Sequence, residues 1–267
     1  MLRPGLDHDG FIAREGALER VSPAFEPVVG AVKSAIAATF GPGRLHSAYL
    51  YGSIPRGTAV PGVSDLDVLV VLNHEPTAAD RSAATALEDK LDARFAQIDG
   101  AGIVLASAAA ILSDLERHDL GWFVACLCTP LVGDDLASRL PRYRPTSLLA
   151  RETNGDLGDL LPCWREALDH ASPADLRSLS RLVGRRLVRT GFTLVMPRWG
   201  GWTSDLEESA AVFGRYYPAR REQMRVAAVI ARTPAEDPSV LRMLVNDLGP
   251  WLASEYLALH GRKAART

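Results

Sequence analysis

Residues 50–70 read LYGSIPRGTAVPGVSDLDVLV, and this stretch decides what kind of fold the chain adopts. An apolar run ends at Gly52, and a second run begins at Leu66 with Asp65 before it and Asp67 within it. Alternate residues of a strand share a face, so we expect both aspartates on one side and Leu66 in the core. Neighbouring carboxylates repel each other and are costly to bury without a positive partner. The stretch therefore predicts a strand, a tight turn and a second strand that begins at a cation site.

The turn between the two runs has the features of a phosphate site. Gly52 lacks a side chain that would keep a ligand away from the backbone, and Ser53 supplies a hydroxyl and an N–H group. Residues 55–60 are expected to begin a short helix whose N–H groups point toward an anion. Mg²⁺ binds carboxylate oxygens together with substrate phosphates. These residues thus predict Mg²⁺ shared between Asp65, Asp67 and a polyphosphate.

Three motifs in this stretch resemble those of the DNA polymerase β-like nucleotidyltransferase superfamily, in its small-molecule, aminoglycoside adenylyltransferase-like branch. The motifs are Gly52-Ser53, Arg56-Gly57-Thr58-Ala59 and Ser64-Asp65-Leu66-Asp67. Residues 181–231 add a weaker likeness, in the order of their helices and turns, to the helical domain of aminoglycoside adenylyltransferases. The resemblance implies a Mg²⁺-dependent enzyme related to antibiotic resistance. It would transfer AMP from ATP, or another nucleoside monophosphate, to a hydroxyl of a small molecule such as an aminoglycoside.

The resemblance also implies roles for individual residues. Asp65 and Asp67 would coordinate two Mg²⁺ ions and act in catalysis. The phosphates of ATP or another NTP would be contacted by residues from both halves of the chain: Gly52, Ser53, Arg56, Ser64, Arg185 and Arg189. Arg56 could instead hold the loop in place, and a solvated helix face explains Arg185 and Arg189 equally well.

The third carboxylate that this family carries on its next strand is missing from the sequence. Its expected position falls near Gly102 or Val104, in the apolar run AGIVLAS. Asp99 is the nearest acid and is predicted to be the third catalytic residue. The alternatives are a carboxylate from the C-terminal half, activation of the hydroxyl by the metal alone, and a non-catalytic nucleotide sensor.

The periodicity of the whole chain predicts two domains. Helices are expected over residues 24–40 and 77–98, and strands over 46–52, 66–72 and 102–106. PRYRPTS near residue 140 has the composition of a linker, and four helices are expected after it, over residues 176–195, 205–216, 218–232 and 238–259. We therefore expect an α/β nucleotidyltransferase domain with a short mixed sheet over residues 1–140. An all-α helical bundle would follow over residues 146–267, with the substrate cleft between the two domains.

The composition of the 267 residues limits the classes of partner. A net charge of -2 gives no overall basic field, so nucleic acid is less favoured than a small-molecule acceptor, while tRNA or protein acceptors stay as alternatives. Cys126, Cys128 and Cys163 match no common zinc spacing and are expected to be reduced core residues of a cytoplasmic protein. No membrane contact is expected, because no apolar run approaches the length of a membrane span. The basic tail GRKAART is expected to be frayed, and the oligomeric state is not indicated.

Overall fold

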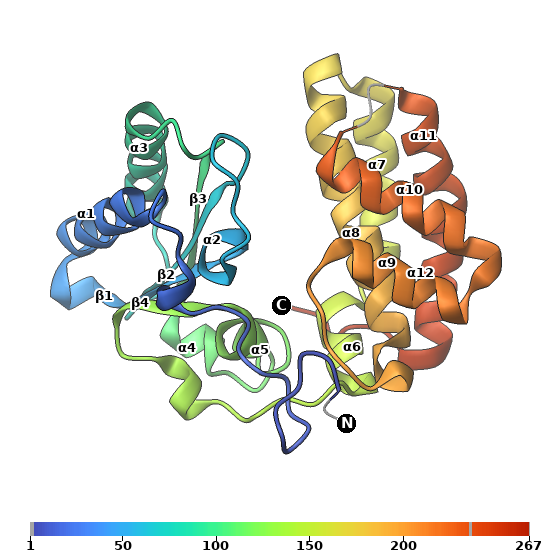
Figure 1. Ribbon diagram of the computed structural model, residues 1–267, viewed down its shortest axis with the longest axis horizontal. Helices are drawn as coiled ribbons and strands as arrows, with labels where there is room; N and C mark the ends of the chain where they lie inside the picture. The colour runs from blue at the N-terminus through green and yellow to red at the C-terminus, as the bar shows by residue number, and fades with distance from the viewer. Residues whose placement is uncertain (1–2, 235–236, 267) are drawn as a thin grey trace. The chain divides into compact units, whose positions relative to one another are not determined.

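The computed structural model describes residues 3–234 and 237–266, which belong to two units (Figure 1). One unit holds residues 13–143, and the other holds residues 144–267 together with the segment that ends at Ile12. Hydrogen bonds attach this segment to the second unit: Trp202 N–H donates to Pro4 O (2.9 Å), and Arg144 Nη2 donates to Asp9 O (2.8 Å). The expected substrate cleft between the two domains stays a prediction.

The unit of residues 13–143 is built on a mixed sheet with the strand order β3-β2-β1-β4. The strands are β1 (Leu45–Tyr51), β2 (Leu66–Leu72), β3 (Ala101–Ser107) and β4 (Thr129–Gly133). β1 is antiparallel to β2 and to β4, whereas β2 and β3 are parallel. The predicted α/β domain with a short mixed sheet is thus confirmed.

The two faces of this sheet are covered by different elements of the same unit. The longer helices are α1 (Glu26–Arg44) and α3 (Ala78–Arg94). The short ones are α2 (Ser53–Arg56), α4 (Ala108–Ile111), α5 (Leu120–Trp122), η1 (Leu18–Arg20), η2 (Phe123–Leu127) and η3 (Leu136–Arg139). Leu66, Val68 and Val70 of β2 pack into one core with α1 and α3, while Leu69 and Val71 pack into a second core on the opposite face. This alternation places Asp67 on the face of Leu69 and Val71.

The second unit is helical in all its regular elements among the described residues, which confirms the predicted all-α half. Its helices are α6 (Ser147–Asn154), α7 (Leu157–His170), α8 (Pro173–Trp199), α9 (Leu206–Tyr216), η4 (Pro218–Arg220), α10 (Arg221–Arg232), α11 (Pro238–Met243), η5 (Leu244–Leu248) and α12 (Gly249–His260). Glycines let α10 approach α8 closely. A Cβ at Gly184 would lie 2.6 Å from Ala227 O, and one at Gly191 would lie 2.3 Å from Met224 Cε.

Most elements expected from periodicity are present, with several corrections. β2 has the predicted bounds, and α1 is interrupted at Gly41 (φ 64°), where the helix was predicted to end. The short helix expected over residues 55–60 instead occupies Ser53–Arg56, because Gly57 ends it in the left-handed conformation (φ 74°). The sequence did not predict α6, α7 or β4.

The expectation of three core cysteines is wrong for Cys163, which is exposed on α7. Cys126 and Cys128 are buried as expected. Burial raises the pKa of the Cys126 thiol to about 12, and it also raises the pKa of Cys128. Both thiols are therefore protonated at neutral pH and are not nucleophiles.

The expectation of a frayed basic tail is also wrong for residues 261–266. Lys263 Nζ lies 3.6 Å from an Asp156 oxygen, and Arg262 pairs with Asp159. Arg266 Nη1 lies 3.2 Å from an oxygen of Glu152, a residue that is 5% exposed. Opposite charges on α6, on α7 and at Asp156 between them thus hold the tail in place. No helix in the described ranges is long and apolar enough to cross a membrane.

Candidate active site

Gly52, which follows β1, combines an unusual backbone conformation with a close contact to Asp67. Its backbone angles are φ 80° and ψ -152°, a region that side chains other than glycine avoid. A Cβ added at Gly52 would lie 2.4 Å from Asp67 Oδ2. Glycine is therefore required here for two reasons. The turn needs its backbone conformation, and any side chain would collide with the Asp67 carboxylate.

Asp67 is held in place by its strand neighbours on both sides. It pairs with Tyr51 across the antiparallel ladder and with Gly102 across the parallel one. A Cβ at Gly102 would meet no atom within 4 Å, so there is open space beside this part of the strand. Asp67 is partly exposed, and the open space at Gly102 on β3 leaves this side of it accessible.

Asp65 immediately precedes β2, and Leu66 separates it from Asp67 along the chain. Leu66 N–H donates to Gly100 O (2.8 Å), which fixes the start of the strand beside the loop that precedes β3. A Cβ at Gly100 would lie 4.0 Å from Asp65 Oδ1. Leu66 itself is fully buried, while Asp65 and Asp67 are both partly exposed. Two carboxylates thus lie at the same end of β2, separated by a core residue.

Arg56 stabilises the turn through its side chain. Its Nε donates to Gly52 O (2.9 Å), and its Nη1 lies 3.7 Å from Glu15 Oε2. The hydrogen bond from Arg56 to Gly52 O joins the last residue of α2 to the residue before the helix, and it holds Gly52 in its conformation. The sequence left two roles open for Arg56, holding the loop and contacting phosphate. The contacts described above hold the loop. Contact of Arg56 with phosphate stays a prediction. Glu15 was not foreseen, because it lies 41 positions earlier in the chain with no local signal.

Ser64 organises the loop that leads into β2. Its Oγ accepts from Val60 N–H (2.9 Å), and its own N–H donates to Val60 O (3.0 Å). Its carbonyl accepts from Asp99 N–H (3.1 Å). The segment carrying Asp99 is therefore bonded to the segment carrying Asp65, although the Asp99 side chain is exposed and precedes β3.

The third carboxylate is absent from β3 itself, as the sequence indicated. Gly102 pairs with Asp67, and Val104 pairs with Leu69. Val104 is 46% exposed on this edge strand. Within residues 3–234 and 237–266, no group of three or more His, Cys, Asp or Glu side chains is arranged to hold a metal ion.

The donor set at the start of β2 nevertheless fits Mg²⁺ bound together with a nucleotide. Mg²⁺ usually keeps several waters and takes one or two carboxylates plus substrate phosphates, rather than a cage built wholly of protein ligands. Asp65 and Asp67 supply two carboxylates, and the missing side chain at Gly52 lets the Asp67 carboxylate lie against the backbone of the turn. A complete site of three acids is not required for this kind of binding.

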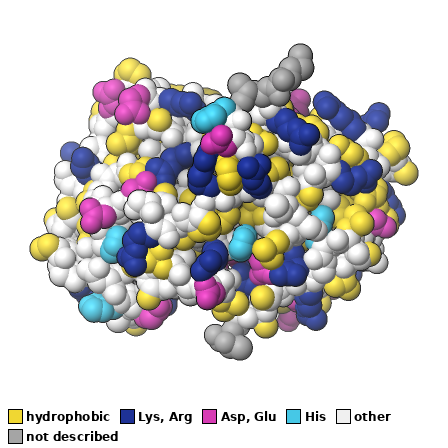
Figure 2. Space-filling model, turned by 90° about the horizontal axis from the view of Figure 1, so that it is seen from below, with side chains coloured by type: hydrophobic (Ala, Val, Ile, Leu, Met, Phe, Trp, Pro, Cys, Tyr) yellow, Lys and Arg dark blue, Asp and Glu magenta, His cyan; other side chains and the backbone are white. Residues whose placement is uncertain are grey.

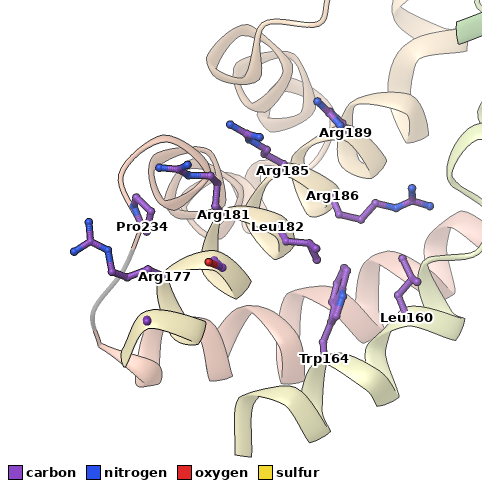
Figure 3. A pocket seen from close by; sticks show the side chains of 11 residues that line it. Leu160, Trp164, Arg177, Arg181, Leu182, Arg185, Arg186, Arg189 and Pro234 are labelled. Atoms are coloured by element: carbon purple, nitrogen blue, oxygen red, sulfur yellow. The ribbon is translucent and has the colours of Figure 1, made fainter. Parts of the chain in front are cut away.

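Arg185 and Arg189 lie on α8 of the helical unit, one helical turn apart and on the same side of the helix (Figure 3). They line a cavity with other arginines, including Arg177 and Arg181, which the sequence analysis did not select. Their four-residue spacing in the sequence, which begins at Arg177, could have indicated that these arginines lie along one side of a helix. The predicted contact of Arg185 and Arg189 with the nucleotide stays a prediction.

Comparisons with known proteins concern the family of this part of the chain and the fold of the whole. Residues 37–100 match the family model described as "Nucleotidyltransferase domain", a range that includes Gly52, Ser53, Asp65 and Asp67. No curated protein matches the chain. The fold is similar to that of the spectinomycin adenyltransferase AAD(9) from Enterococcus faecialis, whose crystal structure contains ATP and spectinomycin. The TM-score is 0.51 at 15% identity, and the match covers 86% of this chain and 98% of the other. Residues 37–100 therefore carry a nucleotidyltransferase domain, and the chain has a fold similar to that of the spectinomycin adenyltransferase.

Proposed function

We propose that this nucleotidyltransferase transfers AMP from ATP to a hydroxyl of a small molecule, with aminoglycoside-like compounds as the first acceptor class. The observation that carries the proposal is the Asp67 carboxylate placed against the Gly52 turn, since it brings a candidate metal ligand next to the candidate phosphate-binding turn. The solved structure with a similar fold contains ATP and spectinomycin, which supports this choice of donor and acceptor.

In the proposed reaction, the acceptor hydroxyl attacks the α-phosphorus of ATP and pyrophosphate leaves. Asp65 and Asp67 hold Mg²⁺, and the backbone at Gly52 with the Ser53 hydroxyl binds the phosphates. Two Mg²⁺ ions held there would supply positive charge that neutralises the entering and leaving oxygens. Arg56 keeps the Gly52 turn in its binding conformation through the bond to Gly52 O. Catalysis of this kind depends mainly on positioning and on charge.

Asp99 is the proposed third acid, which would accept the proton of the acceptor hydroxyl. The bond from Asp99 N–H to Ser64 O supports this role, because it ties Asp99 to the segment that carries Asp65. Arg185 and Arg189 are the proposed additional contacts to the triphosphate. If Asp99 takes no part, a carboxylate of the helical unit or metal activation alone would replace it.

The experiment is a transfer assay with ATP labelled at the α-phosphate, Mg²⁺ and a panel of aminoglycosides and spectinomycin. The expected product is an acceptor that carries AMP, detected by its mass. Asp65→Asn and Asp67→Asn should give no product, while Asp89→Asn, on the exposed side of α3, should give the wild-type rate. Labelling of tRNA or of protein, with no labelled small molecule, would contradict the proposed acceptor class. Nucleotide binding without turnover on any acceptor would favour the sensor.

A further inference from the structure

Residues 14–20 form a strap that contacts α2 on one side and β4, η2 and the start of η3 on the other. Charged side chains of both signs are interspersed on the face of the molecule that Figure 2 shows, so surface charge alone marks no further site there. The strap is distinguished instead by the partners of its backbone, which lie far from it in the chain and next to the Gly52 turn.

The strap is anchored at its start by Arg14 and Glu15. Arg14 Nη1 and Nη2 donate to the two carboxylate oxygens of Asp135 (2.9 and 3.2 Å), and Arg14 Nε donates to Ala125 O (3.2 Å). Glu15 N–H donates to Cys126 O (2.9 Å). An arginine that binds both oxygens of a carboxylate is fixed in orientation as well as in distance. These bonds therefore give the strap a defined position on η2 and at the start of η3.

The strap continues along α2, which has only four residues. One turn of helix is not stable by itself in water, so its position must come from contacts with the rest of the unit. Ile54 supplies such contacts in the core, and the strap supplies others. Ala17 N–H donates to Pro55 O (2.9 Å), and a Cβ at Gly57 would lie 2.9 Å from Arg20 O. The backbone of the strap therefore lies directly against α2 and against the glycine that ends it.

Gly16 is the point at which the strap passes between α2 and β4. A Cβ added there would lie 2.3 Å from Thr129 Oγ1 on β4 and 3.0 Å from Pro55 Cβ on α2. Thr129 is 3% exposed, and its hydroxyl has no hydrogen-bond partner within residues 3–234 and 237–266. The gap therefore has no room for a side chain at position 16, and Thr129 Oγ1 is the atom that closes it most tightly.

We propose that the strap is a positioning element for the ATP-binding turn, and that Gly16 sets the distance between α2 and β4. The inference rests on the proposed function, because it takes Gly52 and Ser53 as the groups that bind the phosphates of ATP. A side chain at position 16 would push α2 away from β4. Ser53 would move with α2, and so would Gly52, which directly precedes it. The affinity for ATP should fall, while Asp65 and Asp67 stay in place at the start of β2.

The test is calorimetric binding of Mg²⁺ with α,β-methylene-ATP, which cannot release pyrophosphate, to the full chain. Gly16→Ala should weaken binding about 10-fold, because a displaced contact group loses its geometry. The double variant Gly16→Ala/Thr129→Ala should bind almost as well as Thr129→Ala alone, since the strap can then shift toward β4. Gly30→Ala is the matched control and should bind like wild type, because Gly30 lies on α1 of the same unit with no atom within 4 Å of its Cβ position.

Transfer kinetics separate positioning from a general loss of structure. In Gly16→Ala, the KM for ATP should rise while kcat at saturating ATP stays near the wild-type value. Arg14→Gln, which removes the anchor on Asp135, should raise the KM for ATP in the same way. Arg14→Lys keeps a positive charge beside Asp135 and should raise it less.

Two results would overturn this inference alone. One is wild-type affinity for the analogue in Gly16→Ala, when its melting temperature shows that it is folded. The other is a loss of affinity that Thr129→Ala does not restore in the double variant. If Gly16→Ala does not fold, an unchanged KM for ATP in Arg14→Gln would overturn the inference instead. Absence of binding by the wild-type chain would overturn the proposed function, and this inference with it, so the two failures are distinguishable.

Discussion

Two charged regions of this chain gather like charges by different means. The aspartates at the start of β2 are placed by the register of three strands and by the glycines beside them. The arginines of α8 are placed by the period of one helix. The acidic site therefore depends on contacts between distant segments, whereas the basic row depends on local spacing. We expect substitutions near β2 to affect activity far more than substitutions along α8.

A third region shows charges that are compensated within the chain. Glu152, on α6, accepts from Arg151 Nε (2.8 Å), from Arg266 Nη1 (3.2 Å) and from Ala264 N–H (3.3 Å). Its carboxylate is therefore surrounded by positive groups from its own helix and from the C-terminal tail. This cluster is a structural reference with which the two charged regions can be compared.

The largest effect is expected from Asp67→Asn. Loss of the metal-binding charge should lower kcat for transfer by about 100- to 1,000-fold or more. The free energy of unfolding should stay the same or rise, because the repulsion with Asp65 is removed. Transfer kinetics and chemical denaturation measure the two quantities. Unfolding of the variant at ordinary temperature would mean that the carboxylate has a structural role instead.

Gly52→Ala should have the next largest effect. The positive φ strains alanine by about 1–3 kcal/mol, and the new Cβ would meet the Asp67 carboxylate. Both stability and transfer should fall. Gly62→Ala is the matched control, because Gly62 also has a positive φ (73°) but open space around its Cβ position. It should lose stability and keep its rate of transfer, and equal loss of activity in both variants would contradict the proposed contact.

Arg56→Gln should have a moderate effect, about 10-fold on kcat/KM for ATP, because it removes the bond that holds Gly52. Glu15→Gln should cost less, since it weakens the more distant contact and leaves that bond intact. The steady-state KM for ATP should rise more than kcat falls if Arg56 positions the phosphate-binding turn. An effect confined to the melting temperature would show that the role is purely structural.

The smallest effect concerns the compensated cluster at Glu152. Burial raises the pKa of this carboxyl, but hydrogen bonds from Arg151, Arg266 and Ala264 outweigh it, so the pKa is lowered overall. The stabilisation is therefore present above the ordinary pKa of a glutamate and is lost as the pH falls through the lowered value. Arg266→Gln should reduce the free energy of unfolding by about 1 kcal/mol at pH 7. The difference from wild type should shrink in acid, and a difference independent of pH would contradict this linkage.

The limits of prediction from sequence are clear from particular residues. β2 was predicted to the residue because a continuous apolar run identifies a buried strand. β4 was missed because its few residues lie in an apolar run that also contains the helical turn η2. Asp99 could be chosen only by its nearness in the chain, and its bond to Ser64 became visible only in the folded unit.

The sequence by itself determined the motif of turn, loop and acidic strand, the change from an α/β half to an all-α half, and the spacing of the α8 arginines. These features depend on residues close together in the chain, whose periodicity and turn chemistry act locally. Only the tertiary structure decided that Asp67 lies against Gly52, that Gly102 is paired with Asp67 where another acid was sought, and that the C-terminal tail is docked. Such contacts depend on strand register and packing between distant segments, which no local pattern encodes.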